Sequence, residues 1–164
     1  MPPTLSKASG SVERAVATTD IDRGCGDTNQ TPLMVASVIG SSRVVRDLLQ
    51  QGASVSLADS DGLTALHHSV YHKHLAVSEY LIEAGADLEA RPGGFVVDGV
   101  DGVPLHVAAT KGFYQGLVVL IDAGANADSK LDDGATPLSL AGWAARSGHS
   151  SPSGERESAL VRIR

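Results

Sequence analysis

The sequence is poor in cysteine, in aromatic residues and in long apolar stretches. Its single cysteine, Cys25, excludes an internal disulfide framework and fits a reducing compartment. Leu117 to Ile121 is the longest strongly apolar stretch, far short of the ~20 residues that cross a bilayer. Met1 to Lys7 lacks the apolar core of a secretory signal. These features predict an intracellular protein, cytoplasmic or nuclear, without membrane insertion.

Positive charge is also scarce. The 164 residues carry 13 Lys and Arg against 19 Asp and Glu, a net charge of −6, which argues against general affinity for nucleic acid. Aromatic residues make up only 4% of the chain, so the core must be built from Ala, Leu, Val and Ile. The hydrophobic fraction of 42% is sufficient for such a core. Eighteen glycines indicate regularly spaced turns.

A short pattern recurs four times along the chain. Its copies are Thr31-Pro32-Leu33, Thr64-Ala65-Leu66, Val103-Pro104-Leu105 and Thr136-Pro137-Leu138, with leucines 33, 39 and 33 residues apart. The same offsets relate a small residue at Ala36, Ser69, Ala108 and Ala141 and a pair at Gly52-Ala53, Gly85-Ala86 and Gly124-Ala125. Agreement at several positions predicts a repeat architecture.

Each unit has the features of two helices. Thr followed by Pro is typical of a helix start, because Thr caps the first turn and Pro is suited to its first position. Gly40 and Gly112 can end the first helix in the left-handed conformation. Apolar residues at helical spacing then predict a second helix, as in Leu117, Leu120 and Ile121.

These motifs resemble the ankyrin repeat family. The matching stretches are Thr31 to Ala36, Thr64 to His67, Pro104 to Ala109, Gly85 to Leu88 and Gly124 to Ala127. The resemblance implies an all-α repeat fold, an ankyrin-like stack of helix-turn-helix units with projecting β-hairpin-like fingers. It also implies the binding of protein partners rather than catalysis.

The resemblance divides the chain into three parts. These are an N-terminal tail over residues 1–26 with a degenerate capping helix near 11–18, an ankyrin repeat domain over 27–145 with units at about 27–59, 60–92, 99–131 and 132–145, and a loop with a truncated C-terminal helix over 146–164. Because the last helix stops before a closing Gly-Ala, the chain is predicted to end within a repeat.

Three departures from the repeat carry expectations of their own. Lys73 replaces the glycine that ends the first helix, so it is expected to be left-handed at a cost of ~1 kcal/mol. Val103 replaces the capping Thr and offers no side-chain acceptor. Six extra residues within 91–100, with a tight turn at 97–100, predict an elongated finger.

A run of histidines invites a metal hypothesis. His68 and His72 are four residues apart and could share one helix face, as zinc ligands do. No cysteine or carboxylate at ligand spacing completes the set, so a His-based metal-dependent hydrolase is the least favoured interpretation. The sequence predicts no enzyme, no catalytic residue and no cofactor.

The resemblance places the partner-binding surface on the concave face of the first helices and on the fingers. Candidate residues are Val35, Val38, Ile39, Leu63, His68, Tyr71, His72, Val107, Thr110 and Lys111, with Phe95 in the elongated finger. A solvated surface does not require an apolar Val38-Ile39 pair beside Tyr71. The pair indicates either a binding site or the docking place of the N-terminal segment.

Acidic residues gather in the predicted turns. They are Asp59, Asp61, Asp98, Asp101, Asp128, Asp132 and Asp133. Asp is common in turns for local reasons, but a row of acidic tips would also steer a basic segment of a partner. We therefore expect a monomeric, non-enzymatic protein-interaction module. The alternative is a targeting or regulatory fragment of a larger enzyme or channel.

Overall fold

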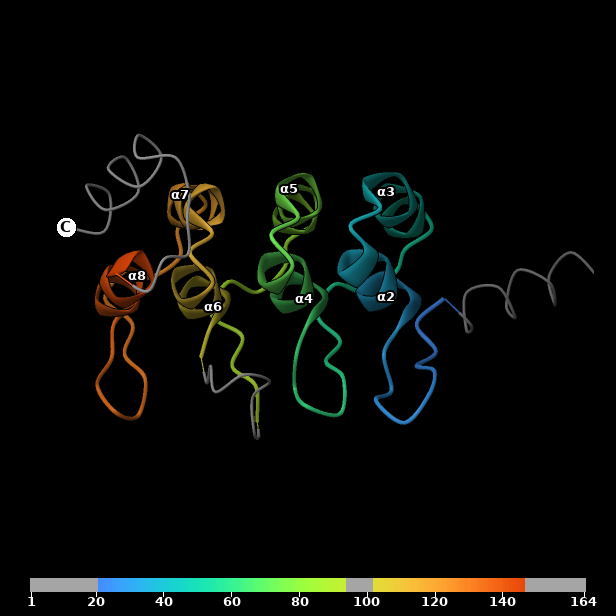
Figure 1. Cartoon of the computed structure of the whole chain (residues 1–164). Helices are drawn as coiled ribbons and strands as arrows, with labels where there is room; N and C mark the ends of the chain where they lie inside the picture. The colour runs from blue at the N-terminus through green and yellow to red at the C-terminus, as the bar shows by residue number, and fades with distance from the viewer. Residues whose placement is uncertain (1–20, 94–101, 147–164) are drawn as a thin grey trace, which may run out of the picture.

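The computed structural model describes residues 21–93 and 102–146 (Figure 1). Within these ranges the chain forms seven helices and no strand: α2 (Pro32–Ile39), α3 (Ser42–Gln50), α4 (Ala65–Tyr71), α5 (Leu75–Glu83), α6 (Pro104–Thr110), α7 (Tyr114–Asp122) and α8 (Pro137–Arg146). The predicted all-α repeat stack is confirmed.

The helices form two rows (Figure 1). The inner helices α2, α4, α6 and α8 pack side by side in chain order, and α3, α5 and α7 each pack on the inner helix that precedes them. The fingers are the loops that lead into the inner helices, and they project from the inner row on the side away from the outer row. Two fingers are closed by isolated antiparallel bridges, Cys25 with Gln30 and Ala58 with Thr64.

The four inner helices begin with different capping chemistry. Thr31 Oγ1 accepts a hydrogen bond from the Met34 N–H at 3.3 Å. The Thr64 hydroxyl and N–H instead meet His67 Nδ1, at 2.9 and 3.2 Å. Val103 occupies the same extended N-cap position without a side-chain hydrogen bond, as predicted. The third inner helix therefore lacks a stabilising contact that the first two have.

The ends of the inner helices also follow the prediction. Gly40 and Gly112 have φ values of 79° and 62°, and Lys73 has a φ of 61° at the equivalent position. A lysine in this conformation carries strain of about 1 kcal/mol that glycine avoids. At Gly40 a side chain would also collide with the His74 ring, which lies 2.4 Å from the place of a Cβ. Glycine is therefore required there for two reasons.

One core runs through the described stack. Its largest buried side chains come mainly from equivalent positions of successive repeats, such as Leu33, Leu66 and Leu105. Small buried residues at Ala36, Ser69, Ala108 and Ala141 allow the helices to approach closely. The core is built of Leu, Val and Ala as predicted, with Tyr114 and Phe113 added to it.

Polar contacts join neighbouring repeats outside the core. Asp22 Oδ1 accepts the Ser54 N–H, and Glu89 Oε1 accepts the Asn126 N–H, both at 2.8 Å. Arg91 donates from its guanidinium to the Lys130 carbonyl at 2.9 Å. Each contact ties the loop of one repeat to the next repeat, so the order of the units is fixed by more than apolar packing.

Several predicted features lie outside the described residues. They are the capping helix near 11–18, the tip of the elongated finger with Phe95, and the helix over 155–164.

Candidate partner-binding surface on the inner helices

Equivalent positions of the inner helices form rows across the stack. Val38, Tyr71, Thr110 and Trp143 share one register, with the repeat offsets of 33, 39 and 33 residues. Ile39, His72 and Lys111 form the next row along the helices. We call the exposed and half-buried members of these rows, together with Val35, the inner face.

The inner face is apolar where it crosses α2. Ile39 is 70% exposed and Val35 is 40% exposed, while Val38 is half-buried between them. Exposed apolar side chains are unremarkable singly, but these residues lie on one helix at adjacent positions of one surface. The sequence-based expectation of an apolar patch on this helix agrees with their exposure.

Aromatic and cationic groups occupy the middle of the inner face. The Lys111 ammonium lies 3.8 Å from the centre of the Tyr71 ring, at the distance of a cation–π contact. The His72 ring meets Tyr71 edge-on at 5.1 Å and stacks on His74 at 6.0 Å between ring centres. His74 Nε2 donates to the Val38 carbonyl at 3.1 Å, which links this cluster to α2.

The electrostatic field at His72 is positive. Partial burial lowers the pKa of His72, and the positive charges of His74, His68 and Lys111 lower it further. His72 is therefore largely neutral at pH 7, and Lys111 supplies the full charge of the cluster.

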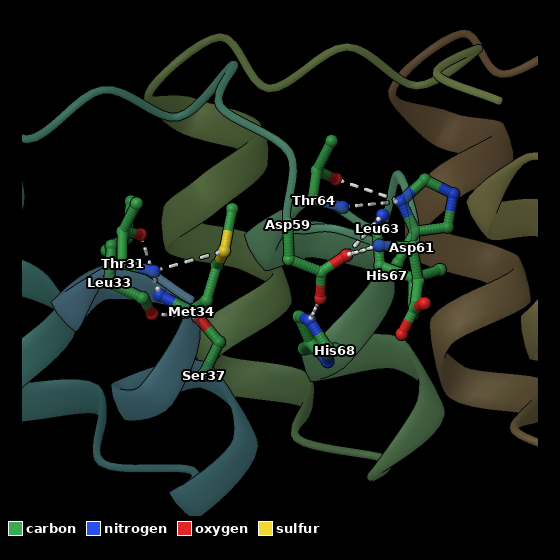
Figure 2. A network of polar contacts seen from close by, with 10 residues as sticks. All are labelled: Thr31, Leu33, Met34, Ser37, Asp59, Asp61, Leu63, Thr64, His67 and His68. Carbon is green, nitrogen blue, oxygen red and sulfur yellow. Dashed lines mark hydrogen bonds and ion pairs between the residues drawn. The ribbon is translucent and has the colours of Figure 1, made fainter. Parts of the chain in front are cut away.

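His68 lies beneath the surface rather than on it. Its side chain is buried and Nε2 contacts Asp59 Oδ2 at 2.8 Å. The other oxygen of Asp59 accepts the N–H groups of Asp61 and Leu63, at 3.0 and 2.9 Å (Figure 2). Leu63 is itself buried. The expectation that Leu63 and His68 present side chains to a partner is not supported, since both hold the second finger against α4.

Val107 is also buried, with only 3% of its surface exposed. It is equivalent to Val35, which is 40% exposed, and the difference follows from packing. α6 has an inner helix packed on each side, α4 and α8, whereas α2 packs on a single described inner helix, α4. Thr110 is half-buried, and its hydroxyl meets no hydrogen-bond partner within the described part of the chain.

The acidic turn residues separate into two groups. Asp128, Asp132 and Asp133 are exposed, as expected for acidic fingertips, and Asp61 is half-buried. Asp59 is wrong as a fingertip charge, because it is buried and committed to His68 and to backbone N–H groups. Asp98 and Asp101 lie outside the described residues.

Trp143 is a surface residue that the candidate set omitted. It lies on α8 and is 53% exposed, although tryptophan is among the largest apolar side chains. The signal was available, since the offset of 33 residues that relates Leu105 to Leu138 also relates Thr110 to Trp143. The first helix of the fourth unit therefore contributes to the inner face as the first two do.

The histidines do not assemble a metal site in the described residues, which contain no group of three potential ligands. His68 contacts Asp59, and His72 is exposed at the end of α4. Cys25 is exposed in a finger, where its thiol approaches the Arg23 carbonyl at 3.8 Å.

The same units are found in known proteins. A family model for ankyrin repeats, in three copies, matches residues 6–92, more than half of the chain. The chain belongs to the ankyrin repeat family. Ankyrin repeats are protein-interaction modules and are generally non-enzymatic. The match covers two of the described helix pairs, and α6 to α8 continue the ankyrin pattern beyond it.

The relatives of this ankyrin chain are much longer proteins. ZDHHC13 of Danio rerio, which carries a palmitoyltransferase name, is 31% identical over 150 residues, covering 74% of this chain and 23% of that protein. Neurogenic locus notch homolog protein 1 of Mus musculus is 30% identical over 145 residues, 74% of this chain and 5% of its own length. Neurogenic locus notch homolog protein 2 of Homo sapiens is 29% identical over 158 residues, 85% and 6% respectively.

The chain thus spans less than a quarter of the length of these relatives. None of the helices in the described ranges has the length and apolarity that a membrane span requires.

Proposed function

We propose that this ankyrin chain is a non-enzymatic interaction module that binds a protein partner through its inner face and fingers. The observation that carries the proposal is the exposure of large apolar side chains in the registers of the inner helices, Ile39 at one end of the described stack and Trp143 at the other. Aromatic and apolar anchors of this kind dominate the free energy of protein association when a partner covers them.

The fingers support a basic segment in the partner. Asp128, Asp132 and Asp133 are exposed in the fingers that follow α7, and each carboxylate there raises the local concentration of a cationic chain. We propose that they accelerate association rather than determine affinity, since exposed charges are screened by salt. The module itself is proposed to be a monomer, which light scattering coupled to size exclusion measures.

A double variant tests the inner face. Ile39→Ser with Tyr71→Ala should reduce partner capture from cell extract at least about tenfold, because truncated anchors typically cost more than 1 kcal/mol each. The matched control is Leu57→Ser, which removes an exposed apolar side chain from a loop outside the inner rows. Quantitative mass spectrometry of the captured proteins gives the ratio, and circular dichroism checks that each variant is folded.

The same variants separate binding from internal docking. If the N-terminal segment covers Ile39, the double variant should lower the free energy of unfolding while capture is unchanged. Capture at the wild-type level by a folded variant would contradict the proposed face and direct attention to the finger with Phe95.

A second function is favoured by the relatives, whose length far exceeds that of this chain. In this alternative the ankyrin repeats are the targeting or regulatory part of a larger enzyme or channel. Sequencing the complete transcript tests it, because an open reading frame through a catalytic or channel domain would support the alternative and an immediate stop codon would oppose it.

A further inference from the structure

The inner face changes its chemistry along the stack. Its two ends are apolar, with Ile39 on α2 and Trp143 on α8. Its middle, on α4 and α6, carries the Lys111 ammonium over the Tyr71 ring, with His72 beside that ring. A cation is thus held by a partly exposed aromatic side chain between two apolar stations.

We propose that Lys111, Tyr71 and His72 form a carboxylate-binding subsite that takes an Asp or Glu side chain of an extended partner peptide, between apolar anchors at Ile39 and Trp143. This inference rests on the proposed function, since it specifies the chemistry of the partner on the same face.

Geometry gives the subsite its orientation. The Tyr71 ring holds the Lys111 ammonium at 3.8 Å, so less side-chain freedom is lost when a carboxylate joins the cation than for a fully mobile lysine. The His72 ring packs on Tyr71 and His74, and its N–H can donate a second hydrogen bond to the same carboxylate. The charges around His72 are positive, which favours an anion over a cation at this point.

A carboxylate fits this subsite better than a phosphate does. Tyr71 ends α4 and Lys111 follows the last residue of α6, so the subsite lies at two helix C-termini. Their partial negative charge opposes a dianion, while phosphate sites are built on helix N-termini or arginine forks. One ammonium and one imidazole match a single negative charge.

The spacing of the inner helices sets the length of the peptide. Neighbouring packed helices lie ~8–10 Å apart, which corresponds to about three residues of extended chain. Ile39 and Trp143 are separated by three such intervals, and the subsite lies between α4 and α6. The partner segment is therefore about nine residues long, with an acidic residue near its centre and an apolar residue about four positions away on each side.

A displayed library of random 12-residue peptides, selected on the whole 164-residue protein, tests the proposal. The selected peptides should share a central Asp or Glu flanked by apolar residues. For a consensus peptide, Lys111→Met should weaken binding about tenfold, as expected for a charge-assisted contact at a covered site. Lys130→Met, which removes the same charge from an exposed finger position, should change binding less than about twofold.

Exchange of the central Asp or Glu for Asn or Gln completes a double-mutant cycle. The exchanged peptide should bind the wild type about tenfold more weakly and no longer distinguish it from Lys111→Met. Urea unfolding of Lys111→Met identifies a role confined to capping α6, which would lower stability without this coupling and would overturn the proposal.

The remaining outcomes are also decisive. A basic or uncharged consensus whose affinity is independent of Lys111 would overturn the carboxylate subsite and leave the proposed function intact. If peptides bind but remain insensitive to both Lys111→Met and the Ile39→Ser with Tyr71→Ala variant, or if none is selected, then both the subsite and the inner face as a peptide-binding surface are wrong.

Discussion

At the scale of single residues, the position three residues after the N-cap adapts to its neighbour. Met34, His67 and Ser139 each contact the threonine that precedes them in the repeat. His106 has no threonine there, and its buried Nδ1 meets no hydrogen-bond partner among the described residues. Its Nε2 donates to the Ser129 carbonyl at 3.2 Å, so Nδ1 is left as an acceptor.

Val103→Thr should therefore stabilise the protein. The new hydroxyl would reach His106 Nδ1 as the Thr64 hydroxyl reaches His67, since both cap residues have extended backbones. A cap contributes about 0.5–2 kcal/mol, less the cost of the lost methyl group, so we expect a net gain of about 0.5–1 kcal/mol in urea unfolding.

Val103→Ala is the control, because it removes apolar contacts at a fully buried position without adding a hydroxyl. It should destabilise by about 1–3 kcal/mol. A loss of stability in the threonine variant would mean that the packing of Val103 outweighs the cap.

At the scale of elements, the helix ends determine how each pair turns. In all three described pairs the chain leaves the inner helix through one left-handed residue, which is Gly40, Lys73 or Gly112. The following N–H then returns to the last turn, as in the bond from His74 N to the Ser69 carbonyl at 2.8 Å. The turn is kept in the second pair although its residue is unfavourable.

Lys73→Gly should relieve this strain. We expect a gain of up to ~1 kcal/mol, reduced by the larger conformational entropy that glycine loses on folding. Lys73→Ala retains a side chain with the same positive φ, so it should be close to neutral and serves as the control. Equal stability of the glycine and alanine variants in urea would show that the left-handed conformation of Lys73 carries no measurable cost.

At the scale of the whole molecule, buried histidines link folding to pH. Burial lowers the pKa of His67 from 6.5 to about 4, and burial also lowers the pKa of His106. Between these pKa values the unfolded chain binds protons that the folded chain does not, so stability is complete above about pH 6.5 and falls as the pH approaches 4.

The loss from His67 alone should be about 3 kcal/mol at pH 4, measured as the free energy of unfolding in urea at pH 7, 5.5 and 4.5. His67→Gln should be less stable at pH 7 but should show a shallower dependence on pH. Because the repeats share one core, the loss should appear as a shift of a single transition. A constant free energy over this range would contradict the neutral, buried state of His67.

The sequence by itself determined the repeat register, the helix starts and the left-handed ends, including the one at Lys73. These features depend on a few neighbouring residues and on spacings that recur, so they can be derived without knowing what packs against them. The same spacing also contained Trp143, which the candidate set did not include.

Only the tertiary structure decided which positions of the inner helices remain exposed. Val35 and Val107 occupy the same place in the repeat, yet one is exposed and the other is covered by helices on both sides. Asp59 and His68 are nine residues apart and became partners because the second finger folds back on α4. Exposure and pairing of this kind depend on groups brought together by the fold, and local sequence does not encode their distance.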